Sequence, residues 1–107
     1  MIEPPIDNIT RTIVEAFHPR RIIMFGSRAR GEARADSDLD LMVEMETSQP
    51  PAERIRMIDA LFGLRRWPMD IIVYTPQEIE HQRGYRNSLI HRIESEGKVL
   101  HDQSRRR

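Results

Sequence analysis

The stretch that decides the fold is residues 26–41, which reads GSRARGEARADSDLDL. One apolar run, Ile22 to Phe25, precedes it, and a second, Leu41 to Val43, closes it. Short apolar runs bounded by turn residues are typical of buried strands. We therefore predict a strand before the glycine-serine pair and another from about Asp38 to Met45. A short helix over Ser27 to Ala35 is expected between them.

The same stretch places ligand-binding groups at fixed spacing. Gly26 and Ser27 end a strand and open a helix, an arrangement that presents free backbone N–H groups to phosphate oxygens. Asp38 and Asp40 are two residues apart, so on a strand both carboxylates project from one face, with roughly 7 Å between their Cα atoms. Two such carboxylates can bind one or two divalent cations. A phosphate site beside a metal site indicates nucleotide chemistry.

Length and composition predict a single intracellular domain. The chain has 107 residues, with an expected core over about 6–101 and a polar tail over 102–107. It has no cysteine, which excludes disulfides and thiolate metal sites and suits the reducing cytoplasm. We see no signal sequence and no apolar stretch of the roughly 20 residues needed to span a bilayer. A cytoplasmic protein without membrane contact is therefore expected.

The charge is balanced in number but uneven in position. Seventeen basic and seventeen acidic side chains give a net charge of zero, which argues against direct nucleic-acid binding. Several arginines are nevertheless expected around the glycine-serine turn. They form either a solvated face or a basic collar for a triphosphate, since arginine makes bidentate contacts with phosphate oxygens. These residues are Arg20, Arg21, Arg28, Arg30 and Arg34.

Apolar residues at helical spacing predict two long helices, from about Asp7 to Phe17 and from about Ala52 to Arg66. In the second helix, Met57 and Leu64 are expected to belong to the core. Trp67, which follows it, is expected to be a packing residue rather than a ligand platform.

The C-terminal third contains clear boundary signals. Thr75, Pro76 and Glu78 form a helix start with a capping box, and Gly84 interrupts that helix. A further helix is expected from about Asn87 to Gly97, then a short strand, Lys98 to His101, and a disordered tail. The alternation of helices and strands predicts an α/β (α+β) fold in which helices flank a small mixed sheet.

Asp70 is unexpected in its surroundings. It stands near the start of an apolar, β-branched segment, Met69 to Tyr74, that predicts a third strand. A buried, unpaired carboxylate is costly, so Asp70 should either reach solvent at the strand end or meet a cation.

The ordered set of Phe25-Gly26-Ser27-Arg28-Ala29-Arg30-Gly31, Ser37-Asp38-Leu39-Asp40-Leu41 and Asp70 resembles the nucleotidyltransferase fold of DNA polymerase β and kanamycin nucleotidyltransferase. It is more similar still to the minimal nucleotidyltransferases, small antitoxins encoded beside HEPN-domain toxins. The resemblance covers about residues 9 to 101. It implies a polymerase β-like fold for nearly the whole chain.

The resemblance also implies a role for each matching residue. Gly26 and Ser27 would bind the β- and γ-phosphates of ATP, with Arg28 and Arg30 as basic residues of the nucleotide site. Asp38 and Asp40 would hold two Mg²⁺ ions, and Asp70 would complete the catalytic metal site. Two metal ions can stabilise both the attacking and the leaving oxygen of an in-line displacement, and Asp70 would take the acceptor's proton. A nucleophilic role for Ser27 is the rival interpretation, but no histidine is placed by sequence to activate it.

The function implied is transfer of AMP from ATP to a tyrosine hydroxyl of a cognate HEPN toxin, with a hetero-oligomer between the two proteins. Larger relatives carry a second domain for the acceptor, and we expect none here. Two alternatives stay open, transfer to a small molecule such as an aminoglycoside and an antitoxin that acts by binding alone. Tyr74 and Tyr85 could also be self-modified, although nothing favours this over ordinary packing.

Overall fold

The computed structural model describes residues 3–65 and 67–105. It confirms the predicted α/β class, with a mixed sheet flanked by helices. In chain order the elements are α1 (Ile6–Phe17), β1 (Arg21–Phe25), α2 (Ser27–Arg30), β2 (Leu39–Glu44), α3 (Pro51–Asp59), β3 (Met69–Tyr74), α4 (Pro76–Arg83), α5 (Leu89–Glu96), β4 (Lys98–Asp102) and a 3₁₀ helix, Gln103–Arg105.

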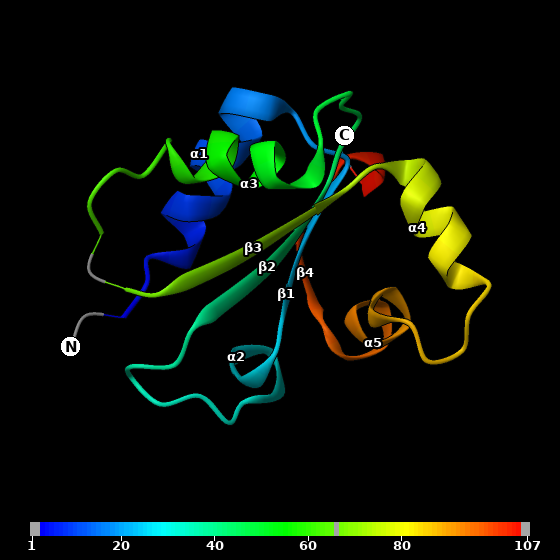
Figure 1. Ribbon diagram of the computed structural model, residues 1–107. Helices are drawn as coiled ribbons and strands as arrows, with labels where there is room; N and C mark the ends of the chain where they lie inside the picture. Colours follow the sequence, from blue (N-terminus) through cyan, green and yellow to red (C-terminus); the bar gives the residue numbers. More distant parts are fainter. Residues whose placement is uncertain (1–2, 66, 106–107) are drawn as a thin grey trace.

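The four strands form one sheet in the order β3-β2-β1-β4 (Figure 1). β1 lies antiparallel to both β2 and β4, whereas β2 and β3 are parallel. The parallel pair requires a crossover connection, which α3 supplies. As a result, β2 and β3 both begin at the same end of the sheet, and α2, which follows β1, lies at that end too (Figure 1).

Side chains alternate between two buried layers, because successive residues of a strand face opposite sides of the sheet. One layer packs beneath α1 and α3 and includes Ile22, Leu41 and Ile71. The other packs beneath α4 and α5 and includes Ile23 and Met42. Figure 1 shows these two helix pairs on opposite sides of the sheet.

The predicted boundaries of β3 and α4 are confirmed. β3 covers Met69–Tyr74 as expected. Thr75 Oγ1 accepts from the Glu78 N–H at 3.2 Å, and Glu78 Oε1 accepts from the Thr75 N–H at 2.9 Å, so the capping box is present. α4 ends at Arg83, directly before Gly84. Local backbone chemistry therefore determines this segment.

The helix predicted from Ser27 to Ala35 is shorter than expected, because α2 ends at Arg30. Gly31 takes a left-handed conformation with φ of 76°, and its N–H donates to Arg28 O at 3.4 Å. The Glu32 N–H donates to Ser27 O at 2.9 Å. These two bonds form a Schellman motif, which terminates a helix at glycine.

The helix predicted to reach Arg66 is also too long, since α3 ends at Asp59. The chain continues as turns, and Gly63 has a positive φ of 54°. Leu64 is fully exposed, so its predicted place in the core is wrong. Trp67 does pack against the core, as expected. The predicted helix end at Arg66 lies outside the described residues.

The predicted disordered tail is wrong for its first residues. Asp102 pairs with Arg21 as the last residue of β4, and the Gln103 N–H donates to Arg20 O at 2.8 Å. Residues 106–107 lie outside the described part of the chain. Within that part, no helix combines the length and apolarity that a bilayer crossing requires.

Candidate active site

The three predicted carboxylates meet at the start of the two parallel strands. Asp40 and Asp70 are register partners across β2 and β3, and Asp38 directly precedes β2. One carboxylate oxygen from each lies within 4.8 Å of the others. Asp38 and Asp70 are exposed and Asp40 is half-buried. Residues thirty positions apart in sequence thus form one acidic cluster.

The glycine-serine turn lies against this cluster. Phe25, the last residue of β1, is the register partner of Asp40, so the chain turns at Gly26 beside the Asp40 carboxylate. Gly26 has a φ of 76°, a conformation that side chains rarely adopt, and a Cβ atom at this position would collide with Asp40 Oδ2. The backbone conformation therefore favours glycine, and any side chain added here would force the Asp40 carboxylate to shift. The Gly26 carbonyl accepts from the N–H groups of Ala29 and Arg30, which starts α2.

The negative charge of the cluster is only partly offset by its surroundings. Burial, followed by repulsion from Asp70 and Asp38, raises the pKa of Asp40, and Arg30 opposes this only in part. Over residues 3–65 and 67–105, none of the ion pairs with arginine involves Asp38, Asp40 or Asp70. Converging carboxylates are the donor set that Mg²⁺ prefers. The geometry and the electrostatics both fit a divalent cation.

Arg28 holds the loop that carries Asp38. Its guanidinium donates to Ser37 O at 2.9 Å and to Ala35 O at 3.2 Å, and it makes an ion pair with Glu3 at 3.2 Å. Its side chain is only 8% exposed. These contacts position the residue just before Asp38, and the predicted contact of Arg28 with a nucleotide stays a prediction.

Arg30 lies differently from Arg28. Its side chain is 42% exposed and its Nε donates to Glu32 at 2.9 Å, a surface ion pair of small energy. It is therefore free to exchange Glu32 for a phosphate. The prediction of a basic collar around the glycine-serine turn is wrong for Arg20 and Arg21, because these two residues lie at the opposite end of β1.

A small hollow beside Gly26 contains residues that the sequence did not indicate. Its volume is about 130 Å³, and Arg92 and Glu96 of α5 line it together with Arg30. Arg92 lies more than sixty residues after Gly26 on a helix without any motif, so no local signal could have identified it. The packing of α5 against β1 brings it there.

Comparisons with known proteins agree with this geometry. A family model described as a nucleotidyltransferase domain matches residues 6–99. The protein adenylyltransferase MntA of Thermococcus cleftensis is 43% identical over 54 residues, which are 48% of this chain and 54% of that protein. A protein of Methanocaldococcus jannaschii, named as a candidate protein adenylyltransferase, is 32% identical over 60 residues, 51% of this chain and 60% of its own length.

The fold is shared with a crystal structure of a candidate nucleotidyltransferase from Sulfolobus solfataricus. The TM-score is 0.66 at 18% identity, covering 94% of this chain and 79% of that one. The matched region spans little more than half the length of the two adenylyltransferase relatives. The family match, in contrast, extends from α1 into β4 and includes every residue of the acidic cluster, and so the chain belongs to the family of nucleotidyltransferase domains.

Proposed function

We propose that this protein is a Mg²⁺-dependent nucleotidyltransferase that moves AMP from ATP to a hydroxyl group of a protein acceptor. The observation that carries the proposal is the convergence of Asp38, Asp40 and Asp70 within 4.8 Å, beside a turn at Gly26 where an added Cβ atom would collide with Asp40. The names of the two adenylyltransferase relatives support a protein acceptor. The finer proposal is a tyrosine of a cognate HEPN toxin, which the modification would silence.

The three carboxylates would hold Mg²⁺, with one or two ions. Bound Mg²⁺ would stabilise the negative charge that develops on the phosphate oxygens during transfer. Asp40, as the half-buried member, gains most from a cation, because burial and its two acidic neighbours both disfavour its charged form.

The reaction itself is a displacement at the α-phosphorus of ATP. The acceptor oxygen forms a bond to this phosphorus, the bond to the bridging oxygen of the β-phosphate breaks, and pyrophosphate leaves. Asp70 is exposed at the start of β3 and would take the proton of the acceptor hydroxyl on a carboxylate oxygen. The proton therefore moves to a group already oriented by the sheet.

The leaving pyrophosphate needs positive partners on the other side of the cluster. The N–H groups at the Gly26–Ser27 turn come before Ala29 and Arg30, whose N–H groups form the first hydrogen bonds of α2, so they would be able to donate to a phosphate. Arg30 and Arg92 line the adjoining hollow. Arginine matches phosphate oxygens with two donors at once. Arg28 would act indirectly by fixing the loop before Asp38.

The test is label transfer. The purified protein is incubated with Mg²⁺ and ATP labelled at the α-phosphate, together with either the product of the adjacent gene or an aminoglycoside, with Asp38→Asn as control. Label on the partner that disappears with Asp38→Asn or with a chelator supports the proposal. A stable complex without label would favour an antitoxin that acts by binding, and label on an aminoglycoside alone would favour a small-molecule acceptor.

A further inference from the structure

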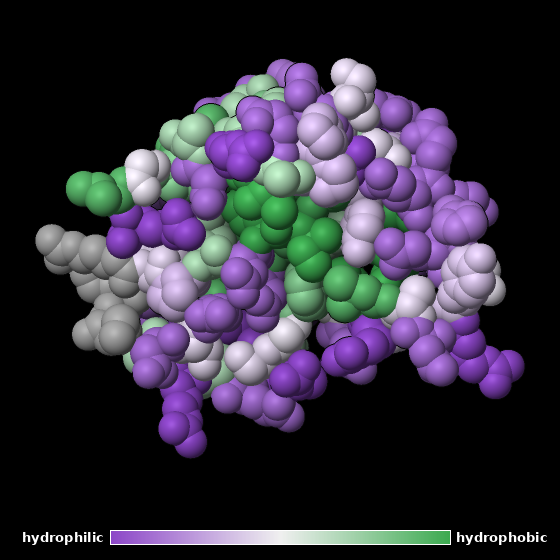
Figure 2. Space-filling model, viewed as in Figure 1, coloured by the Kyte–Doolittle hydropathy of each residue, from purple (hydrophilic) through white to green (hydrophobic). Residues whose placement is uncertain are grey.

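An apolar groove follows the free edge of β3, between α3 and α4. Its volume is about 550 Å³, and its apolar lining comes from Pro51, Ile55, Ile72, Val73 and Tyr74. Figure 2 shows this region as an apolar patch in the middle of the molecular face, bordered by hydrophilic residues. β3 is an edge strand of the sheet, so the groove is open along one side.

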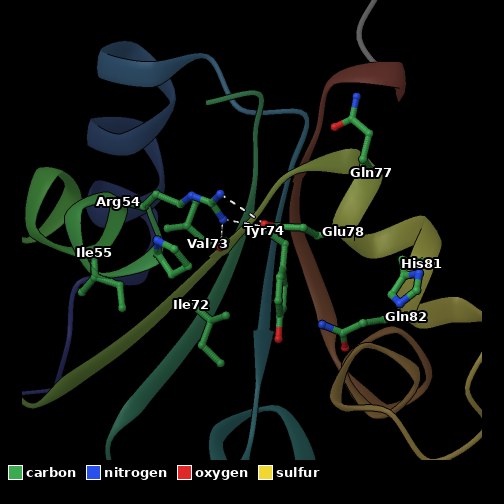
Figure 3. Close-up of a pocket in the computed structure, with 10 residues that line it drawn as sticks. Arg54, Ile55, Ile72, Val73, Tyr74, Gln77, Glu78, His81 and Gln82 are labelled. Atoms are coloured by element: carbon green, nitrogen blue, oxygen red, sulfur yellow. Dashed lines mark hydrogen bonds and ion pairs between the residues drawn. The ribbon is translucent and has the colours of Figure 1, made fainter. Parts of the chain in front are cut away.

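The groove shares strand β3 with the acidic cluster, although Asp70 is not one of the residues that line it. Asp70, Ile72 and Tyr74 alternate along β3, so they share the face on which Tyr74 packs with the α4 and α5 layer. Their spacing places the Cα atoms of Ile72 and Tyr74 about 7 and 13 Å from that of Asp70. In Figure 3 the Tyr74 ring lies between Ile72 and Gln82, with its hydroxyl directed away from Arg54. A molecule in the groove that extends about 7 Å beyond Ile72 toward the start of β3 would therefore reach Asp70.

The arginine on the polar wall of the groove is already paired with a carboxylate. Arg54, whose side chain is only 7% exposed, donates to both carboxylate oxygens of Glu78, at 2.8 and 3.2 Å (Figure 3). It also donates to Val73 O at 3.1 Å and to Gln49 O at 2.7 Å. Because these bonds occupy its donors, Arg54 does not offer a free cation to a phosphate. The groove therefore suits an apolar partner rather than a nucleic acid, which the acidic cluster would also repel.

The edge of β3 is protected against pairing with another strand. The Pro68 and Tyr74 carbonyls accept from the chain on the β2 side, namely from the N–H groups of Leu39 and Met45. The carbonyls of Met69 and Val73 therefore face outward. Arg65 Nη2 donates to Met69 O at 3.4 Å and Arg54 Nη1 to Val73 O at 3.1 Å. An added strand would have to displace both guanidinium groups to form a continuous ladder. A helix, which needs only side-chain contacts, fits better.

We propose that this groove binds an amphipathic helix of the protein acceptor. Its apolar side chains enter between Ile55, Ile72 and Tyr74, and a hydroxyl-bearing residue reaches Asp70. The distances of about 7 to 13 Å correspond to roughly one to two helical turns between the apolar anchors and the modified residue. This inference rests on the proposed function, because it assigns the acceptor site of that reaction.

Fluorescence anisotropy with three labelled peptides of identical composition tests the groove. One places its leucines on a single helical face, one scrambles them, and one alternates them as in a strand; each has one tyrosine. The helical peptide should bind at least tenfold more tightly than the others, and Ile72→Lys should weaken it at least tenfold. Val99→Lys, an exposed position on the opposite edge strand, should have no effect. Equal binding of the scrambled peptide, best binding of the strand peptide, or unchanged binding by Ile72→Lys would overturn the proposal.

Two further measurements separate this inference from the proposed function. Ile55→Lys, on α3, should reproduce the loss if Ile72→Lys proves unfolded by circular dichroism. With an acceptor protein, Ile72→Lys should raise the KM for the acceptor at least tenfold and leave the KM for ATP unchanged. Unchanged acceptor KM with active transfer would overturn the groove alone. Helical-peptide binding that survives in Asp40→Asn, with no label transfer by the wild type, would overturn the reaction and leave the groove as a docking surface.

Discussion

The two ends of the β1–β2 ladder carry acidic residues on one face of the sheet, yet in different surroundings. Glu44 lies opposite Arg21, which donates to Glu44 at 2.6 Å and to Glu94 at 2.7 Å. Arg83 adds a second donor to Glu94 at 2.6 Å. At the other end Asp40 lies opposite Phe25 and beside two further aspartates.

The difference separates charges that are paired within the chain from charges that we propose to be catalytic. At the Glu44 end, each buried charge has a partner within the chain, which offsets its loss of hydration. At the Asp40 end, three negative groups converge without such a partner among the described residues, so the site costs stability until a cation binds. Two carboxylates on β2, only four residues apart, thus have opposite effects on stability.

The largest difference between the two ends is expected in the transfer rate, when one carboxylate at each end is replaced by its amide. Asp40→Asn should lower AMP transfer by about 10³-fold, since it removes a ligand of the Mg²⁺ that would stabilise the charge developing on the phosphate oxygens. Glu44→Gln should leave the transfer rate within a fewfold of wild type. Label transfer at saturating ATP measures both, and an equal loss in the two variants would refute the distinction.

The free energy of unfolding, in contrast to the transfer rate, should depend on the Glu44 end and hardly on the Asp40 end. Arg21→Met leaves Glu44, whose side chain is 10% exposed, without its partner, and should lower the free energy of unfolding by about 2–4 kcal/mol. Arg30→Met, at the other end, removes only a surface pair and should change it by less than about 0.5 kcal/mol. Urea denaturation gives both values; similar losses would mean that the Arg21 network is not structural.

The paired end should also be the acid-sensitive one. The hydrogen bond from Arg83, with a further one from Arg21, lowers the pKa of Glu94 despite its burial. A lowered carboxylate pKa stabilises the fold above the unfolded pKa, and this stabilisation is lost as the pH falls through the folded pKa. We expect the unfolding free energy of the wild type to fall below about pH 4.3 and that of Glu94→Gln to fall less steeply. Parallel profiles would exclude Glu94 as a contributor.

The smallest effect should come from Arg30. Arg30→Ala should raise the KM for ATP about three- to tenfold, the loss expected from one exposed phosphate contact, and leave the unfolding free energy nearly unchanged. Initial rates at varied ATP measure the change. Arg56→Ala, which removes an exposed arginine of α3 that also pairs with one surface glutamate, is the matched control. An unchanged KM in Arg30→Ala would remove Arg30 from the nucleotide site.

Local chemistry written in the sequence determined several features of this protein. The boundaries of β3, the capping box of Thr75 and Glu78, and the end of α4 before Gly84 follow from residue preferences within a few positions. The acidic candidates were also predictable, because Asp38, Asp40 and Asp70 interrupt or border apolar runs where charge is costly. That the three converge was implied only by the family resemblance, because local residue preferences do not say which strands pair.

Only the tertiary structure decided which charges meet. The parallel pairing of β2 with β3 brings Asp70 to Asp40, and the antiparallel pairing of β1 with β2 sends Arg21 to Glu44. Helical periodicity predicted that α3 continues past Asp59 and that Leu64 is buried, whereas the chain leaves the helix before Gly63. The roles of Arg28 and Arg92 depend in the same way on loop and helix packing. Such contacts join residues distant in sequence, and their energies appear only when the sheet has assembled.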